Sequence, residues 1–90
     1  MRLTNQFELI HMKTMTCKQL GGACDQEFHA NTFEDIVVMS KQHGLEMFKK
    51  DDKPHREMMD KMMNLMKSPE AMQNWFAGKR NEFNALPENE

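Results

Sequence analysis

Hydrophobic residues recur at the spacing of an α-helix over three segments that fill most of the chain after residue 31. The first segment begins at Thr32, a good capping residue, and Glu34 and Asp35 place negative charge in its first turn. Its apolar stripe includes a histidine and is formed by Phe33, Ile36, Val37, His43, Met47 and Phe48. These features predict a helix that packs one face against the rest of the protein.

Two prolines mark the starts of two further helices, because proline suits the first turn of a helix but not its interior. The second helix is predicted from about Pro54 to Lys67. Its broad apolar face consists of Met58, Met59, Met62, Leu65 and Met66. Ser68, Pro69 and Glu70 are a cap, a proline and an acid in the order typical of a helix start, and Pro87 ends this third helix.

An alternating pattern precedes the helices. Residues 13–18 read KTMTCK, in which two threonines alternate with apolar side chains, and this pattern favours a β-strand. Gly21 and Gly22 indicate a turn, and residues 25–30 are a second, weaker strand candidate. The sequence therefore predicts an α+β protein, a short N-terminal β-hairpin packed against three α-helices.

The length of the chain, 90 residues, allows one small domain with a modest core. Residues 1–11 show no hydrophobic period, and we expect a poorly ordered leader there. Residues 12–86 are expected to form the single domain, and residues 87–90 an acidic, frayed tail. A metal ion or a partner would matter to the stability of so small a domain.

The charge pattern excludes several classes of protein. The net charge is -2, and acidic and basic residues are interspersed, so we expect no nucleic-acid binding and no membrane anchor. The apolar runs are too short to span a membrane, and the N-terminus lacks the apolar region of a secretory signal.

Cysteines in such a chain are expected to be reduced thiols, which predicts a cytoplasmic protein. No familiar catalytic motif is present, so we expect a non-enzymatic protein.

The candidate chemistry lies in two cysteines and two histidines. Cys17 and Cys24, the two cysteines of the chain, flank the two-glycine turn, and His29 and His43 follow. Thiolates and imidazoles are donors preferred by zinc and by softer metals. The six residues between the cysteines exceed the roughly two to four that are typical of a zinc knuckle, so the spacing alone is not diagnostic.

The rise of strands and helices predicts which of these residues can meet. A strand from Cys24 to His29 spans roughly 16 Å, and the first helix up to His43 also rises roughly 16 Å. If the helix returns antiparallel to the strand, His43 lies level with Cys24, whereas His29 lies at the other end and on the other face. We therefore expect Cys17, Cys24 and His43 to converge, with His29, Asp25 or water in a fourth position.

The same residues also allow other interpretations. The cysteines of the hairpin could be buried free thiols, a disulfide or a redox pair. His43 on an apolar stripe could be a core histidine that is hydrogen-bonded to the backbone. His55, near the start of the second helix, is expected to be exposed.

Methionine is unusually frequent, with eleven in the chain and five on the second helix. Methionine fills irregular gaps, which predicts a plastic core. A methionine-rich surface that grips a partner helix or a second copy is a further possibility, and it defines an alternative function, an interaction module or homodimer without metal. Thioether ligation of copper(I) is a third, since Met59 or Met62 could lie level with His43.

The segment MKTMTCKQLGGACD at residues 12–25, followed by TFED at 32–35 and by His43 and Gly44, resembles the bacterial and archaeal domain of unknown function 1059. Its members are described as predicted small metal-binding proteins. The resemblance is strongest over residues 12–48 and implies Cys17, Cys24 and His43 as ligands. Shorter members tend to have a second histidine about one and a half turns after the first, where this chain has Phe48. Residues and resemblance together predict a small metal-binding protein with a structural zinc site.

Overall fold

The computed structural model describes residues 11–88, and these residues form the predicted α+β fold. The elements are β1 (Lys13–Thr16), the short 3-10 helix η1 (Lys18–Leu20), β2 (Glu27–Ala30), α2 (Phe33–Lys49), α3 (Lys53–Leu65) and α4 (Pro69–Ala85). Most of the predicted leader, residues 1–11, and the last two residues of the predicted tail, 87–90, lie outside the described residues. Those two predictions stay untested.

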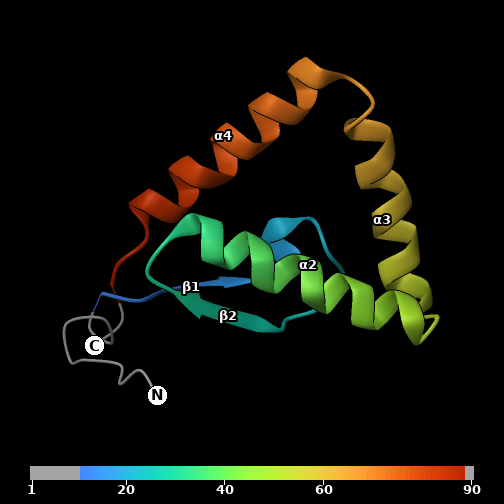
Figure 1. The fold of residues 1–90 in the computed structure, drawn as a ribbon, viewed down its shortest axis with the longest axis horizontal. Coiled ribbons are helices and arrows are strands. Elements are labelled where there is room, and N and C mark those ends of the chain that lie inside the picture. Colours follow the sequence, from blue (N-terminus) through green and yellow to red (C-terminus); the bar gives the residue numbers. More distant parts are fainter. Residues whose placement is uncertain (1–10, 89–90) are drawn as a thin grey trace.

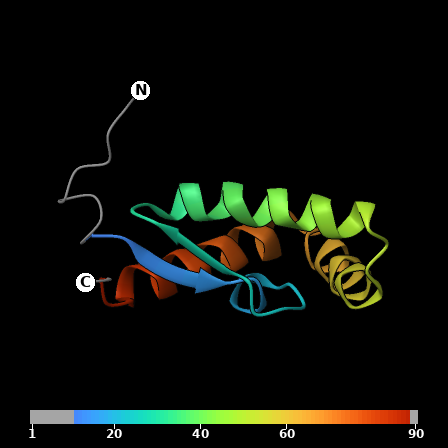
Figure 2. The ribbon, with the colours of Figure 1, turned by 90° about the horizontal axis from the view of Figure 1, so that it is seen from below.

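The two strands pair antiparallel, with Met15 opposite Phe28 and Thr14 opposite His29. Side chains alternate between the two faces of a strand, so Met15 and Phe28 are buried while His29 is exposed on the other face. Helix α2 runs along this hairpin, as the turned view shows (Figure 2). Both strands are shorter than the sequence predicted, because the chain leaves the ladder at Cys17 and rejoins it only at Glu27.

Each of the three α-helices begins at a side-chain cap. Thr32 accepts a hydrogen bond from the Asp35 amide, and Ser68 accepts one from the Ala71 amide, which confirms two predicted helix starts. Helix α3 begins at Lys53, one residue earlier than predicted, because Asp52 rather than a later residue is its cap. It ends at Leu65, two residues short of the predicted end.

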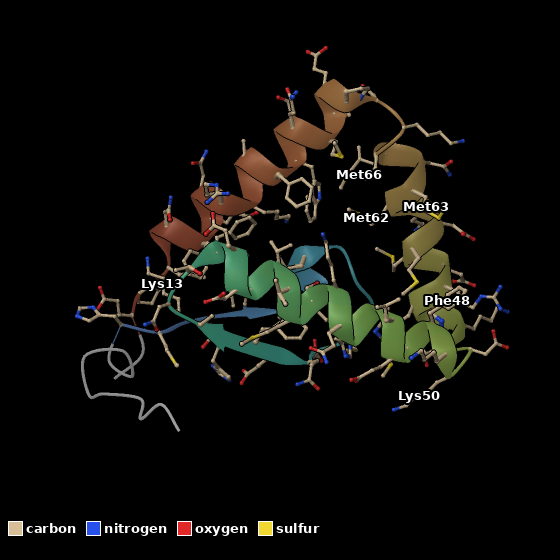
Figure 3. The ribbon with its side chains drawn as sticks, viewed as in Figure 1. Lys13, Phe48, Lys50, Met62, Met63 and Met66 are labelled. Carbon is tan, nitrogen blue, oxygen red and sulfur yellow. The ribbon has the colours of Figure 1, made fainter. Side chains whose placement is uncertain are left out.

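The apolar core lies at one end of the molecule, between the hairpin, the first half of α2 and the second half of α4. Ile36 is fully buried there, and the rings of Phe33 and Phe83 lie 6.0 Å apart. The Lys13 ammonium donates to the Phe83 and Asn84 carbonyls, which ties β1 to the end of α4 (Figure 3). The core is therefore built by the hairpin, α2 and α4.

Helices α2, α3 and α4 outline an open triangle, with α3 at the end away from this core (Figure 1). Among the described residues of α3, the one buried side chain is that of His55. The second half of α2 is likewise poorly covered: Phe48, predicted to lie on the apolar stripe that packs, is 57% exposed. That expectation is wrong because α2 continues past the end of the hairpin, where no sheet covers it.

Candidate metal centre

The loop between the strands folds Cys24 back beside Cys17. The Cys17 amide donates to the Gln26 carbonyl at 2.8 Å, and the Lys18 amide donates to the Cys24 carbonyl at 3.0 Å. The Cys17 carbonyl in turn accepts from the Gly22 amide at 2.8 Å. These bonds close a compact loop around the first cysteine, so six intervening residues bring the two sulfur atoms as close together as a shorter spacing would.

Gly22 is required by this loop for a specific steric reason. A Cβ atom added at Gly22 would lie 2.1 Å from Cys17 Sγ and 3.0 Å from the Cys17 carbonyl oxygen. Real atoms do not approach so closely, so any larger residue would push the sulfur away. Gly21 has a φ of 89°, in the left-handed region that favours glycine, and it ends the short helix η1.

Two histidines from two helices complete the cluster. His43 of α2 places Nε2 3.2 Å from Cys24 Sγ, and its ring packs edge-on against Phe28 of the hairpin. His55 of α3 places Nε2 3.6 Å from Cys17 Sγ, and it is 6% exposed. One ligand atom from each of the four residues lies within 4.8 Å of all the others. Thus three separate parts of the chain contribute donors to one point.

The donor set and its dimensions fit a tetrahedral metal ion. Zinc takes thiolate sulfur at about 2.3 Å and imidazole nitrogen at about 2.0 to 2.1 Å, so neighbouring donors around it lie roughly 3.3 to 3.8 Å apart. The two sulfur–nitrogen distances, 3.2 Å for Cys24 and His43 and 3.6 Å for Cys17 and His55, are close to this range. Pairs separated by up to 4.8 Å need only a small side-chain adjustment to reach it.

Asp52 holds His55 in the orientation that a metal ligand requires. Its Oδ2 atom lies 2.5 Å from His55 Nδ1 and also accepts the His55 backbone amide at 3.1 Å. The bond to Nδ1 leaves Nε2 free to face Cys17, which is the carboxylate–histidine arrangement common behind metal ligands. The hydrogen bond from the His55 ring also lowers the pKa of the Asp52 carboxyl, so the carboxylate is ionised at neutral pH.

The protonation states of two cluster residues follow from their surroundings. Burial lowers the pKa of His43, and the nearby His55 lowers it further, so His43 is neutral and its nitrogen can bind a metal at pH 7. Burial raises the pKa of the Cys17 thiol, against the effect of the Cys24 and Ala23 backbone amides. A buried thiol of this kind becomes a thiolate when a cation binds it.

The structure brings together Cys17, Cys24 and His43, the three residues that the rise along strand and helix predicted to converge. Both cysteines are free thiols and form no disulfide with each other. His29, named as a candidate fourth ligand, is not part of the cluster. It lies on the exposed face of the hairpin, where Nδ1 is 2.8 Å from Thr14 Oγ1, because its odd offset from the buried strand positions turns it outward. Asp25, the other protein candidate, is exposed and pairs with Lys18.

His55 fills the fourth position, and the expectation that it would be exposed is wrong. The sequence does contain a local signal for this position, because an aspartate three residues before a histidine can cap a helix and bind the histidine ring at once. The other cause is the tight turn after α2. Asp51 adopts a φ of 58°, and the Asp52 amide donates to the Met47 carbonyl, so α3 starts immediately beside α2.

Comparison of the chain with protein-family models, with curated proteins and with solved structures finds no match. Within residues 11–88, no helix has the length and apolar character needed to cross a bilayer. Fold and site thus define a small α+β domain with a two-cysteine, two-histidine cluster that could hold a metal ion.

The steric role of Gly22 gives a first prediction. Gly22→Ala should displace Cys17 Sγ and weaken zinc binding at least about tenfold, since one of four donors is lost or misplaced. Gly78→Ala is the matched control, because a Cβ atom there meets nothing within 4 Å and alanine favours the helix. Competition with a chromophoric chelator measures both affinities. Equal zinc affinities for the two variants would contradict the packing described for the loop.

Proposed function

We propose that this protein is a small, non-enzymatic metal-binding protein that holds one zinc ion in a structural site. The ligands are the thiolates of Cys17 and Cys24 and the Nε2 atoms of His43 and His55. One observation carries the proposal: four donors suited to zinc, drawn from a loop and two helices, lie within 4.8 Å of one another. The carboxylate of Asp52 behind His55 supports it, because it fixes the ring with Nε2 toward the cluster, as carboxylates behind metal-binding histidines do.

A structural role for the metal follows from where the ligands sit. Helix α3 contributes no buried apolar side chain among its described residues, and its single buried residue is the ligand His55. Zinc would join the loop of the hairpin, α2 and α3 at the end of the molecule where the described residues of α3 add no buried apolar side chain to the core. Metal binding energy would then act as folding energy for that end.

We also propose that the protein has no catalytic activity. Four protein ligands are typical of closed structural zinc sites, whereas catalytic sites keep one position for water or substrate. The raised pKa of the Cys17 thiol also argues against a thiol redox enzyme, which needs a thiolate at neutral pH. The free thiols suit a reducing, cytoplasmic setting. The resemblance to the domain of unknown function 1059 supports metal binding through Cys17, Cys24 and His43.

An interaction module or homodimer is the second candidate, and one surface favours it. Val38, Leu45 and Phe48 recur along α2 and are 61%, 62% and 57% exposed, and Leu45 and Phe48 border the hollow between α2 and α3. Residues seven and ten positions apart on a helix share a face, so these three side chains form an apolar stripe. This function does not exclude the metal site, which lies deeper between the helices.

Native mass spectrometry of protein purified without added metal tests both candidates. We expect the mass of one chain plus one zinc ion, and a melting temperature that falls by roughly 10 °C or more after chelation, since structural zinc supplies several kcal/mol. A mass of two chains would support the homodimer. A metal-free mass with an unchanged melting temperature after chelation would refute the zinc site.

Two histidine variants test whether zinc binding depends on the histidines of the cluster or on a histidine outside it. His55→Gln removes a donor and should weaken zinc binding by about a hundredfold, given the donors' close convergence. His29→Gln removes a histidine of the same chain that lies outside the cluster, and zinc affinity should stay unchanged. Isothermal titration with a competing chelator measures both. A similar loss in the two variants would mean that His55 is not a ligand.

A further inference from the structure

A cavity of about 740 Å³ lies beside the metal centre, between α2, α3 and the loop of the hairpin. Cys17, His43 and His55 form part of its wall, so the cavity and the cluster share residues. Besides His55, Arg56 and Asp60, the side of the wall formed by α3 and its C-cap consists of five methionines: Met58, Met59, Met62, Met63 and Met66. In Figure 3, Met62 and Met66 extend from α3 toward the space between the helices.

Two of these methionines lie directly against residues of the centre's own framework. A Cβ atom on Gly21, in the loop between the two cysteines, would come within 2.7 Å of Met62 Sδ. A Cβ atom on Gly44, the neighbour of His43, would come within 3.4 Å of the Met59 terminal methyl. Met59 and Met62 are one turn apart on α3, so both thioethers face the same side of the helix.

The chemistry of the wall selects one class of ligand. Thioether sulfur binds soft monovalent cations such as copper(I) and has little affinity for hard cations, which need oxygen donors. Among the described residues of the wall, Asp60 supplies the single carboxylate, while Lys41 and Arg56 carry positive charge. The cavity wall therefore offers a hard divalent cation too few oxygen ligands, and its positive charges disfavour such a cation.

Packing alone does not account for these methionines. Methionine used as filler closes gaps in a core, yet here the side chains border a cavity that stays open, and Met63 is 68% exposed. Leucine at these positions would be as apolar as methionine, and its side chain would be less flexible. What methionine adds at these positions is a sulfur donor on a side chain that can rotate toward an ion.

We propose that this cavity binds copper(I), with Met59 and Met62 as thioether ligands, next to the thiolate–imidazole centre. The ion binds without a change of oxidation state. This second site goes beyond the proposed structural zinc site and stands whether or not zinc fills that centre. Because the cavity shares Cys17, His43 and His55 with the centre, an ion bound by the thioethers would lie in the same cavity that Cys17 lines.

Silver(I), a redox-stable substitute for copper(I), tests the proposal on the full chain carrying ¹³C-labelled methionine methyl groups. The first equivalent should go to the thiolates, which bind it more strongly. The second should shift the methyl resonances of Met59 and Met62 and remain bound in native mass spectrometry. The double variant M59L/M62L should lose that second equivalent while its zinc stoichiometry stays the same as in the unmodified chain.

M39L/M72L is the matched control, because both residues are 38% exposed and lie outside the cavity wall. It should keep the second equivalent of silver(I). Unshifted Met59 and Met62 methyl resonances, or equal silver stoichiometry in the two double variants, would overturn the thioether site. Failure of zinc to bind any of the proteins would refute the structural zinc site alone, since the silver measurements do not depend on it.

Discussion

The position of α3 depends chiefly on the convergence of four donor atoms, because none of the apolar side chains described in this helix is fully buried and Met59 and Met62 are only half-buried. Among its described residues, only His55 is buried, and a histidine supplies little of the free energy that apolar burial gives. Its ring is held from one side by Asp52 and faces Cys17 on the other. A metal ion at that point would replace the missing core by bonds to the loop and to α2.

The molecule therefore has two ends that are stabilised in different ways. At one end, Phe33, Ile36 and Phe83 form an ordinary apolar core between the hairpin, α2 and α4. At the other, the helices diverge, a cavity remains open, and the sulfur and imidazole donors of the cluster lie beside apolar side chains such as Leu20 and Phe48. A small domain buries a smaller fraction of its surface than a large one, so a metal at the end where the described part of α3 buries no apolar side chain would add stability that burial does not supply there.

Local signals in the sequence predicted the fold class, the caps Thr32 and Ser68 and the meeting of Cys17, Cys24 and His43, because strand and helix rise are fixed by backbone geometry. The position of His55 could not be predicted from local patterns, because it depends on the tight turn after α2 and on the two roles of Asp52, as cap of α3 and as partner of the His55 ring. The exposure of Phe48 could not be predicted either, since helical spacing does not show where the hairpin beneath the helix ends.

Amide hydrogen exchange with and without zinc tests most directly whether the metal holds α3 in place. We predict that chelation removes protection from residues 53–65 while residues 13–16, 27–30 and the first half of α2 keep theirs, because the core contacts of Phe33, Ile36 and Phe83 persist without the metal. Equal protection of α3 in the zinc-bound and chelated protein would contradict it, and α3 would then owe its position to contacts other than the metal centre.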